Sequence, residues 1–368
     1  MTHLSAVWLE KHGRWQINVT SSGKRKSFYS SIPGKAGKRE AEERAAAWLR
    51  EGTPGQETVS DAWTLFLQRE ARMTGSGNVT NMESFGRAYI LPAVGHCRLS
   101  SVRVRDWQRI LDDAASRGLS RKTLNNIRAA IRKFQKWCDG NDLNVRTGPL
   151  EVARSAPPSR RTVATPDQIR TLFSKDTVIK RGREGHEWWI HAFRFILACG
   201  LRRGECTGIM ETDIEENVLV IRRSINPAGE VTEGKTVNAQ RRIALSSLAM
   251  QIIEDQRAQK RTSHIVSPWL FCSAKGEAMD TCALQREWHR FFAPQSGITC
   301  GLHELRHTFI SIVKSDMPLA LLRSQVGYAA GTDSIGIYGH EYDGDLPRSR
   351  EIVEQAFFAL ACYKLTQK

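Results

Sequence analysis

The sequence predicts a multidomain α+β protein. We expect a small N-terminal module of three β-strands and a helix, an all-α domain, and a mainly α domain with a small β-sheet. Polar and apolar residues alternate over 16–20, as they do in a strand. Apolar residues then recur at helical spacing from 58 to 146. A proline- and arginine-rich stretch at 147–164 separates these parts from a long C-terminal region.

Residues 1–52 are predicted to form the first module. The first strand leads into turn-forming residues at 22–25 and a further strand at 26–31. Residues 38–48 have a helix-forming composition with one apolar face. The module is either a DNA-binding unit or a basic appendage without a specific site. Its candidate DNA-binding cations are Lys24, Arg25 and Lys26.

Residues 58–146 are predicted to form the all-α domain. Thr58 is a candidate N-cap for a helix whose apolar face includes Val59 and Trp63. A later helix has an apolar stripe that ends at Trp137, and its cations lie off that stripe: Arg121, Lys122, Arg128, Arg132, Lys133 and Lys136. A positive helix face is most often simply solvated. Its place directly before a basic linker favours contact with a phosphate backbone.

The basic linker at 147–164 is predicted to be extended and semi-rigid, because it contains three prolines. Its arginines suit a connection that passes close to DNA: Arg154, Arg160 and Arg161. Thr165, Pro166 and Gln168 then match a capping box with proline at the first helical position. A new domain is therefore placed at 165–368.

The charge balance favours a polyanionic partner. The 368 residues include 54 Lys and Arg against 39 Asp and Glu, a formal net charge of +15. Such a surplus favours nucleic acid through counterion release, although many basic proteins have no such partner. No apolar run is long enough for a membrane span, and the N-terminus lacks a signal-peptide pattern. We expect a cytoplasmic protein without a membrane partner.

No metal and no cofactor is predicted. The eight cysteines are scattered without a Cys-x-x-Cys pair, so we interpret them as small, mostly buried apolar residues. No cluster of carboxylates suggests a metal-dependent nuclease, and no Gly-x-x-x-x-Gly-Lys loop suggests the use of ATP.

The residues that carry chemistry lie in the C-terminal region. Arg202 follows a Gly-Leu pair after an apolar segment, and His303 and Arg306 are spaced to share one helix face. Tyr338 lies further on in a glycine-flanked segment. Phosphodiester transfer builds negative charge on the non-bridging oxygens, and arginine pairs with phosphate through a planar fork that stays protonated. Two arginines, a histidine and a late tyrosine suit DNA strand transfer through a covalent phosphotyrosine.

In this order and context, the set closely resembles the tyrosine recombinases, the family of phage and mobile-element integrases. The resemblance implies that Arg202 and Arg306 clamp the scissile phosphate and that Tyr338 is the nucleophile. His303 is expected to shuttle a proton or to bind the phosphate. Glu205 is expected to orient Arg202 or to cap the adjoining backbone. The reaction needs no cofactor, because the covalent intermediate conserves the bond energy.

The family also keeps a lysine on a β-hairpin as the general acid for the departing 5′-oxygen. Lys235 matches it, in a segment that we interpret as the hairpin tip between strands at 217–223 and 241–245. The sequence departs from the family at Tyr328, where histidine or tryptophan is usual. A tyrosine can donate one hydrogen bond to phosphate but carries no charge. The rival candidates are close neighbours: Arg203 for the first clamp, and Tyr342 or Tyr328 for the nucleophile.

The same resemblance implies roles for the domains. Residues 1–52 correspond to an arm-type DNA-binding domain, 58–146 to a helical core-binding domain and 165–368 to the catalytic domain. The expected partners are double-stranded DNA at core and arm-type sites, a homotetramer on that DNA, and an excision factor or host DNA-bending protein. The apolar residues at 351–365 are expected either to dock on a neighbouring copy or to cover the chain's own core.

The implied function is a site-specific recombinase that integrates, and also excises, a phage or mobile element in a bacterial host cell. Three alternatives stay open. They are a chromosome-dimer resolvase, a type IB topoisomerase-like enzyme, and a non-catalytic DNA-binding protein of the same fold.

Overall fold

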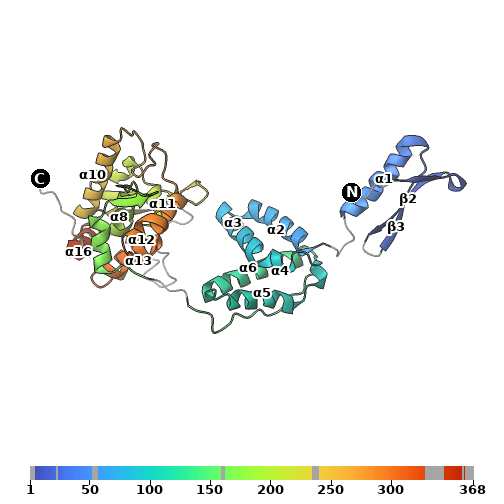
Figure 1. Ribbon diagram of the computed structural model, residues 1–368, viewed down its shortest axis with the longest axis horizontal. Helices are drawn as coiled ribbons and strands as arrows, with labels where there is room; N and C mark the ends of the chain where they lie inside the picture. The colour runs from blue at the N-terminus through green and yellow to red at the C-terminus, as the bar shows by residue number, and fades with distance from the viewer. Residues whose placement is uncertain are drawn as a thin grey trace. The chain divides into compact units, whose positions relative to one another are not determined.

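The computed structural model describes residues 5–21, 24–51, 57–158, 162–233, 240–327, 344–358 and 360. It divides into two units, Met1–Ser159 and Arg160–Lys368 (Figure 1). Separate hydrophobic cores form in the N-terminal module, in the helical part that follows it, and in the second unit. The predicted multidomain α+β class is confirmed. No helix among the described residues is long and apolar enough to cross a membrane.

The N-terminal module is a three-stranded antiparallel sheet packed against one helix, as predicted. Ile17 and Val19 alternate with exposed polar residues on the central strand, so they enter a small core with Ala41 and Ala45 of the helix. The elements are β1 Val7–Leu9, β2 Arg14–Ser21, β3 Lys24–Ser30 and α1 Gly34–Glu51.

Four helical stretches follow in the same unit. They are α2 Val59–Met73, then α3 Ser76–Phe85 running on through the π-helical turn Gly86–Ile90 into α4 Leu91–Val94, then α5 Val104–Ser116 and α6 Arg121–Asp139. Thr58 caps α2 as predicted, because its hydroxyl accepts the Asp61 N–H at 3.1 Å while the Asp61 carboxylate accepts the Thr58 N–H. The π turn begins at Gly86, where a Cβ would lie 2.5 Å from the buried indole nitrogen of Trp63.

The first half of the predicted linker packs against this helical part. Gln108 of α5 pairs with both backbone groups of Glu151, at 2.9 and 3.0 Å. The backbone N–H of Arg121 donates to the Pro157 carbonyl at 2.9 Å. Leu150 is 2 % exposed and joins the helical core. These contacts hold the chain against α5 and α6 well beyond residue 146. Arg160 and Arg161 lie outside the described residues.

Three of the α6 cations proposed to line a DNA-facing surface have partners within the protein. The guanidinium of Arg121 donates to the Arg154 carbonyl, and that of Arg128 donates to the side-chain oxygen of Asn125 at 2.7 Å. Lys133 forms an ion pair with Glu70, which is 1 % exposed. Three other cations of this helix are exposed to solvent and accessible to DNA: Lys122, Arg132 and Lys136. A DNA contact by Lys133 would have to compete with a buried carboxylate.

Replacing Lys133 with alanine is therefore expected to destabilise the helical part by about 1–3 kcal/mol, because Glu70 loses one of the partners that compensate its burial. The loss is limited because Arg69 and Asn78 still contact the Glu70 carboxylate. Urea unfolding followed by circular dichroism measures it. Arg132→Ala, on the exposed neighbour, serves as the control and should change stability by less than about 0.5 kcal/mol. Equal effects of the two variants would contradict the role given to Lys133.

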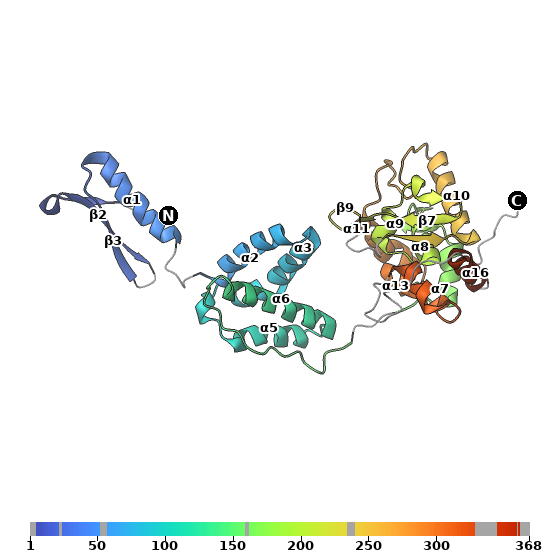
Figure 2. The ribbon, with the colours of Figure 1, turned by 180° about the vertical axis from the view of Figure 1, so that it is seen from behind.

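The second unit is built around α8 Ile190–Cys199, in which every residue is buried. Helices α10 Ser247–Thr262 and α13 Leu302–Val313 both pack against it (Figure 1 and Figure 2). Thr165 begins the unit's first helix with the predicted capping box. The other α-helices in the described part of this unit are α7 Pro166–Ser174, α9 Arg203–Thr207, α11 Thr281–Glu287, α12 Ala293–Gln295, α14 Leu319–Val326 and α16 Asp345–Phe358.

The strands predicted at 217–223 and 241–245 form as β7 Val218–Ile221 and β10 Arg241–Ala244, an antiparallel pair. With β6 Ile214–Glu215 they make a three-stranded sheet of order β10-β7-β6. Two further hairpins are present: β4 Thr177–Lys180 with β5 Arg183–His186, and β8 Ser224–Ile225 with β9 Val231–Thr232.

The hairpin tip predicted at 233–236 lies almost wholly outside the described residues and stays a prediction. A tight turn that was not predicted forms at 226–230, where the Asn226 side chain accepts the backbone N–H groups of Ala228 and Glu230 and Gly229 takes a φ of 81°. Lys235 comes after β9 and lies outside the described residues.

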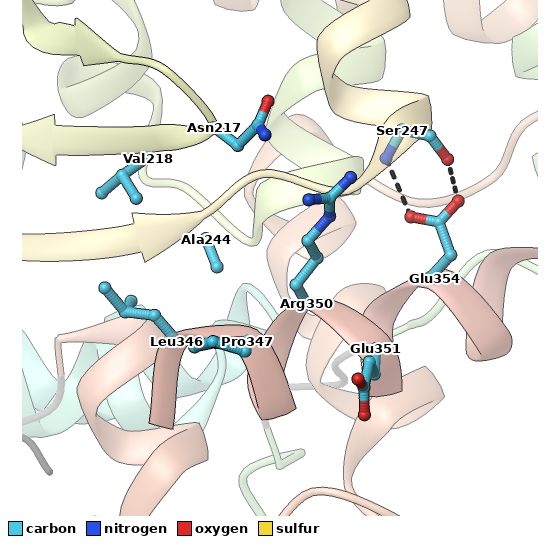
Figure 3. A pocket seen from close by; sticks show the side chains of 9 residues that line it. All are labelled: Asn217, Val218, Ala244, Ser247, Leu346, Pro347, Arg350, Glu351 and Glu354. Atoms are coloured by element: carbon cyan, nitrogen blue, oxygen red, sulfur yellow. Dashed lines mark hydrogen bonds between the residues drawn. The ribbon is translucent and has the colours of Figure 1, made fainter. Parts of the chain in front are cut away.

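The C-terminal helix α16 covers the unit's own core. Val353 and Phe357 are 3 % and 2 % exposed within that core. Glu354 accepts the backbone N–H of Ser247 at 2.8 Å, so its carboxylate lies at the N-terminus of α10 (Figure 3). A pocket of about 410 Å³ lies beside this contact, lined by Asn217, Val218, Ala244, Ser247, Leu346, Pro347, Arg350, Glu351 and Glu354. The described part of 351–365 thus supports the alternative in which the apolar residues cover this chain's own core.

His191 of α8 makes the stability of this unit sensitive to acid. The residue is 7 % exposed, and its burial, together with the charges of Arg194 and His186, lowers its pKa to about 3. The unfolded chain has the ordinary pKa of 6.5. Below pH 6.5, His191 is therefore protonated in the unfolded chain but stays neutral in the folded chain. The free energy of unfolding falls by about 1.4 kcal/mol for each pH unit below 6.5.

Urea unfolding at pH 7.5 and pH 5.5 should show this loss in the wild-type chain, and His191→Leu should make it smaller by about 1–1.5 kcal/mol. The control is His264→Gln, because His264 is exposed. If His191→Leu keeps the full acid dependence, the histidine is not the group responsible.

Candidate active site

Arg202 lies where α8 ends and α9 begins. Gly200 ends α8 in the left-handed conformation, with a φ of 67°, and a Cβ there would lie 2.4 Å from the Phe309 ring. The chain therefore turns sharply, and Arg202 becomes the N-cap residue of α9. Its side chain is 41 % exposed, so it is accessible from solvent.

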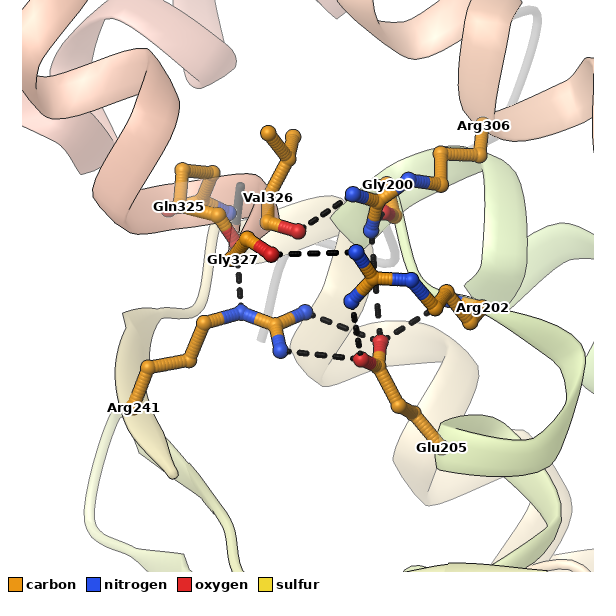
Figure 4. Close-up of polar contacts among 8 residues, drawn as sticks. All are labelled: Gly200, Arg202, Glu205, Arg241, Arg306, Gln325, Val326 and Gly327. Carbon is orange, nitrogen blue, oxygen red and sulfur yellow. Dashed lines mark hydrogen bonds and ion pairs between the residues drawn. The ribbon is translucent and has the colours of Figure 1, made fainter. Parts of the chain in front are cut away.

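Glu205 both orients Arg202 and caps the adjoining backbone, the two roles expected from the sequence. Its Oε1 accepts from Nη1 of Arg202 at 2.7 Å, and its Oε2 accepts the Arg202 backbone N–H at 2.9 Å (Figure 4). Burial alone would raise the pKa of Glu205. The hydrogen bonds and charge of Arg241, and those of Arg202, instead lower it to about 2. The carboxylate is thus ionised across the physiological range and fixes the guanidinium beside it.

Arg306 lies on α13 and points toward the same place. Its residue is 1 % exposed, and Nη1 donates to the Gly200 carbonyl at 2.8 Å while Nη2 donates to the Val326 carbonyl. Nη1 is also 4.0 Å from Glu205 Oε2. The structure therefore brings Arg202 and Arg306 together across the Glu205 carboxylate (Figure 4). Arg306 forms the buried floor of the cluster and Arg202 its exposed part.

His303 is on the same helix, one turn before Arg306 and exposed to solvent. Its ring is 5.1 Å from that of His307, edge to face. Partial burial, the neighbouring His307 and the charge of Arg306 lower the pKa of His303. The imidazole is therefore mainly neutral at pH 7 without DNA, and one ring nitrogen is free to accept a proton.

Arg241 completes the cluster, and sequence reasoning missed it. This arginine of β10 has a side chain 5 % exposed and pairs with both oxygens of Glu205, at 3.0 and 2.9 Å. One signal could have found it. Arg241 has the same strand parity as Ile243 and Leu245, which are both buried, so it faces inward while Arg242 faces out.

The other predicted site residues are not described. Lys235, Tyr328, Tyr338 and Tyr342 lie outside the described residues, so their roles stay predictions. Among the described residues, no group of His, Cys, Asp or Glu side chains forms a metal-binding cluster. The seven described cysteines are free, and five of them are buried.

Two family models match the chain. The model of the phage integrase family matches residues 163–344, which contain the whole arginine cluster. The model of the phage integrase N-terminal SAM-like domain matches residues 65–139. The chain belongs to the phage integrase family. Its members are the tyrosine recombinases that the sequence resembles.

Solved structures of other integrases share the fold. The Tn1549 transposon integrase in complex with transposon right end DNA has 17 % identity and a TM-score of 0.59, over 80 % of this chain and 98 % of that one. A lambda integrase dimer bound to a COC′ core site has 15 % identity and a TM-score of 0.56, over 92 % and 96 %. A lambda integrase tetramer bound to a Holliday junction has 14 % identity and a TM-score of 0.54, over 91 % and 96 %. No curated protein sequence matches this integrase-family chain.

Proposed function

We propose that this chain is a site-specific DNA recombinase that cuts and rejoins strands through a 3′-phosphotyrosine. The observation that carries the proposal is the arginine cluster, in which Arg202 and Arg306 converge across one ionised carboxylate. Three guanidinium groups around a single carboxylate leave a surplus of positive charge. Such a surplus suits an anion, and a phosphodiester is the anion that the family acts on.

The proposed reaction transfers the phosphoryl group twice. The Tyr338 hydroxyl attacks the scissile phosphorus and the bond to the 5′-oxygen breaks, leaving a 3′-phosphotyrosine and a free 5′-hydroxyl. Lys235 protonates the departing 5′-oxygen, and Arg202 and Arg306 offset the charge on the non-bridging oxygens. His303, neutral before DNA binds, accepts the proton of the tyrosine or donates a hydrogen bond to the phosphate. Attack by the 5′-hydroxyl of a partner strand reverses these steps.

We further propose that the chain acts as a tetramer on two duplexes, to integrate and excise a phage or mobile element. The fold similarity to a lambda integrase tetramer on a Holliday junction and to a transposon integrase on its element's end supports this assembly and this role. An excision factor or a host DNA-bending protein is the further partner expected for such an element.

Covalent trapping tests the function. Each test duplex comes from the DNA that flanks the coding region and has a nick a few nucleotides to the 3′ side of the candidate cleavage position. After cleavage, the short fragment that carries the free 5′-hydroxyl diffuses away, so the strand cannot be resealed. We expect an adduct that survives denaturing electrophoresis, with protein on the 3′ end. Its formation should not depend on added metal. Tight binding without an adduct would favour the non-catalytic alternative, and relaxation of any supercoiled plasmid would favour the topoisomerase-like one.

We propose that residues 1–52 bind arm-type DNA through their sheet. On α1, the cations Lys38, Arg39 and Arg44 pair with glutamates of the same helix. On the sheet, Arg14 lies over the Tyr29 ring, and Lys26 lies 5.4 Å from the centroid of the Phe28 ring. No ion pair with a carboxylate involves these two sheet cations in the described part of the module. The sheet therefore carries positive charge that no carboxylate of the described module offsets, while most of the α1 cations with described side chains are paired.

A chain that begins at Thr58 is expected to cleave core sites as the full chain does, but to lose binding to arm-type DNA. Residues 1–52 contain ten Lys and Arg against five Glu, so they can make several phosphate contacts. Each contact steepens the fall of log affinity with log salt by about 0.9. Fluorescence anisotropy across a salt series measures both effects. If the slope of log affinity against log salt is the same in the shortened chain, residues 1–52 do not bind DNA, and a role in contacting another protein is favoured.

A further inference from the structure

Arg241 is a buried arginine whose three side-chain nitrogens each donate to a group of the protein. Its Nη1 and Nη2 donate to the two oxygens of Glu205, at 3.0 and 2.9 Å, and its Nε donates to the Gln325 carbonyl at 2.9 Å (Figure 4). With its side chain only 5 % exposed, Arg241 cannot reach a phosphodiester on the surface. Arg241 can therefore affect the reaction only through the groups to which it donates hydrogen bonds.

The first of these groups is the carboxylate that orients Arg202. Glu205 accepts from Arg202 and Arg241 on both oxygens. The paired donors of Arg241 fix the plane of the carboxylate. Through Glu205, the buried Arg241 thereby fixes the direction of the exposed Arg202 guanidinium.

The second group is the end of α14. Three successive carbonyls there each accept from a different arginine of the cluster: Gln325 from Arg241, Val326 from Arg306, and Gly327 from Arg202. The Gln325 side chain, in turn, accepts from the Ser349 hydroxyl of α16 at 3.2 Å. Helices α14 and α16 are thus tied together where Arg241 binds.

We propose that Arg241 is a positioning residue for strand cleavage. It holds the Glu205 carboxylate and the end of α14 in one arrangement, so that Arg202 faces the scissile phosphate. This inference rests on the proposed recombinase function and deepens it. It assigns Arg241 no contact with DNA.

The test compares cleavage rate constants on nicked duplexes at saturating DNA. Arg241→Ala is expected to slow adduct formation by about 10–100-fold, the scale of a misplaced catalytic group, while the apparent Kd for DNA stays within about threefold. In an Arg202→Lys background, the same change should cost much less, because the group that Arg241 positions is already impaired. Arg241→Lys should cost less than Arg241→Ala, and it serves as the readout if the alanine variant fails to fold.

Arg242 provides the matched control, because it is the adjacent residue of the same strand and is exposed. Arg242→Ala should leave the rate constant within about twofold. If the fold-losses in cleavage rate constant of the Arg241 and Arg202 variants multiply in the double variant, the two residues act independently and the proposal is overturned. An Arg241→Ala defect that appears only as weaker DNA binding would overturn it as well.

A DNA-free measurement separates this proposal from the proposed function. In ¹⁵N spectra of arginine side chains, the Arg202 guanidinium should give slowly exchanging signals in the wild-type chain and in Arg242→Ala, and should lose them in Arg241→Ala. If they persist in Arg241→Ala, Arg241 does not position Arg202, whether or not DNA is cut. If the wild-type chain forms no adduct on any duplex, the recombinase function fails, and these spectra still decide whether Arg241 orients Arg202.

Discussion

Tyr338→Phe is expected to bind core-site DNA as the wild-type chain does and to form no covalent adduct at all. The change removes only the attacking oxygen and leaves the arginine cluster untouched, so the phosphate is still held but nothing can attack it. Gel shift measures the binding, and denaturing electrophoresis of a nicked duplex measures the adduct. The loss should be complete because no other group supplies the oxygen of the phosphotyrosine bond.

The matched controls are the two rival tyrosines. Tyr342→Phe should still form the adduct, and so should Tyr328→Phe, although that change removes a potential hydrogen-bond donor to the phosphate. Peptide mapping of the wild-type adduct locates the modified tyrosine directly. An adduct that persists in Tyr338→Phe and disappears in Tyr342→Phe would move the nucleophile to position 342.

Arg202→Ala is expected to slow cleavage by about 10²–10³-fold, as when a donor to the transition state is removed. Folding should be little affected, because the side chain is 41 % exposed and Glu205 keeps Arg241 as its partner. Single-turnover adduct formation measures the rate, and thermal unfolding checks the fold. Arg203→Ala should cost much less. A greater loss from Arg203→Ala would mean that the first clamp is the neighbouring arginine.

Arg306→Ala should lose cleavage on the same scale and stability as well. Its guanidinium is buried and satisfies the carbonyls of Gly200 and Val326, and an unpaired buried carbonyl costs about 1–3 kcal/mol. The stability of the two variants thus distinguishes the two arginines, although both are proposed to act on one phosphate. An Arg306→Ala chain that cleaves normally would contradict that proposal.

Features that depend on residues close together in the sequence were predictable, because the hydrogen bonds that form them are local. Thr58 and Thr165 were recognisable as helix N-caps since the bonds involved join residues three positions apart. Arg202 and Glu205 form the same kind of contact, and their pairing was expected from the family resemblance, which places an acidic residue three positions after the arginine. The turn at 226–230 was not predicted, although Asn226 and Gly229 both suit a turn and the Asn226 side chain accepts two backbone N–H groups there.

The partners of buried charges were not predictable in this way. Lys133 and Arg132 are both cations off the apolar stripe of one helix, but only Lys133 meets a buried glutamate from α2. Arg241 and Arg242 are adjacent on one strand, but only Arg241 enters the site. Which cation is free for DNA depends on which element packs opposite it, and that information lies far away in the chain.

The sequence by itself determined the family, the order of the domains' structural types, and the pairing of Arg202 with Glu205. The family follows from the resemblance of several motifs in their order, the structural types from periodicity, and the Arg202–Glu205 pairing from a spacing of one helical turn. Only the tertiary structure decided that Arg202, Arg306 and Arg241 meet at one carboxylate and at three successive carbonyls of α14. These residues come from four separate elements, and a buried carboxylate must recruit its cations from whatever the fold brings within hydrogen-bonding distance.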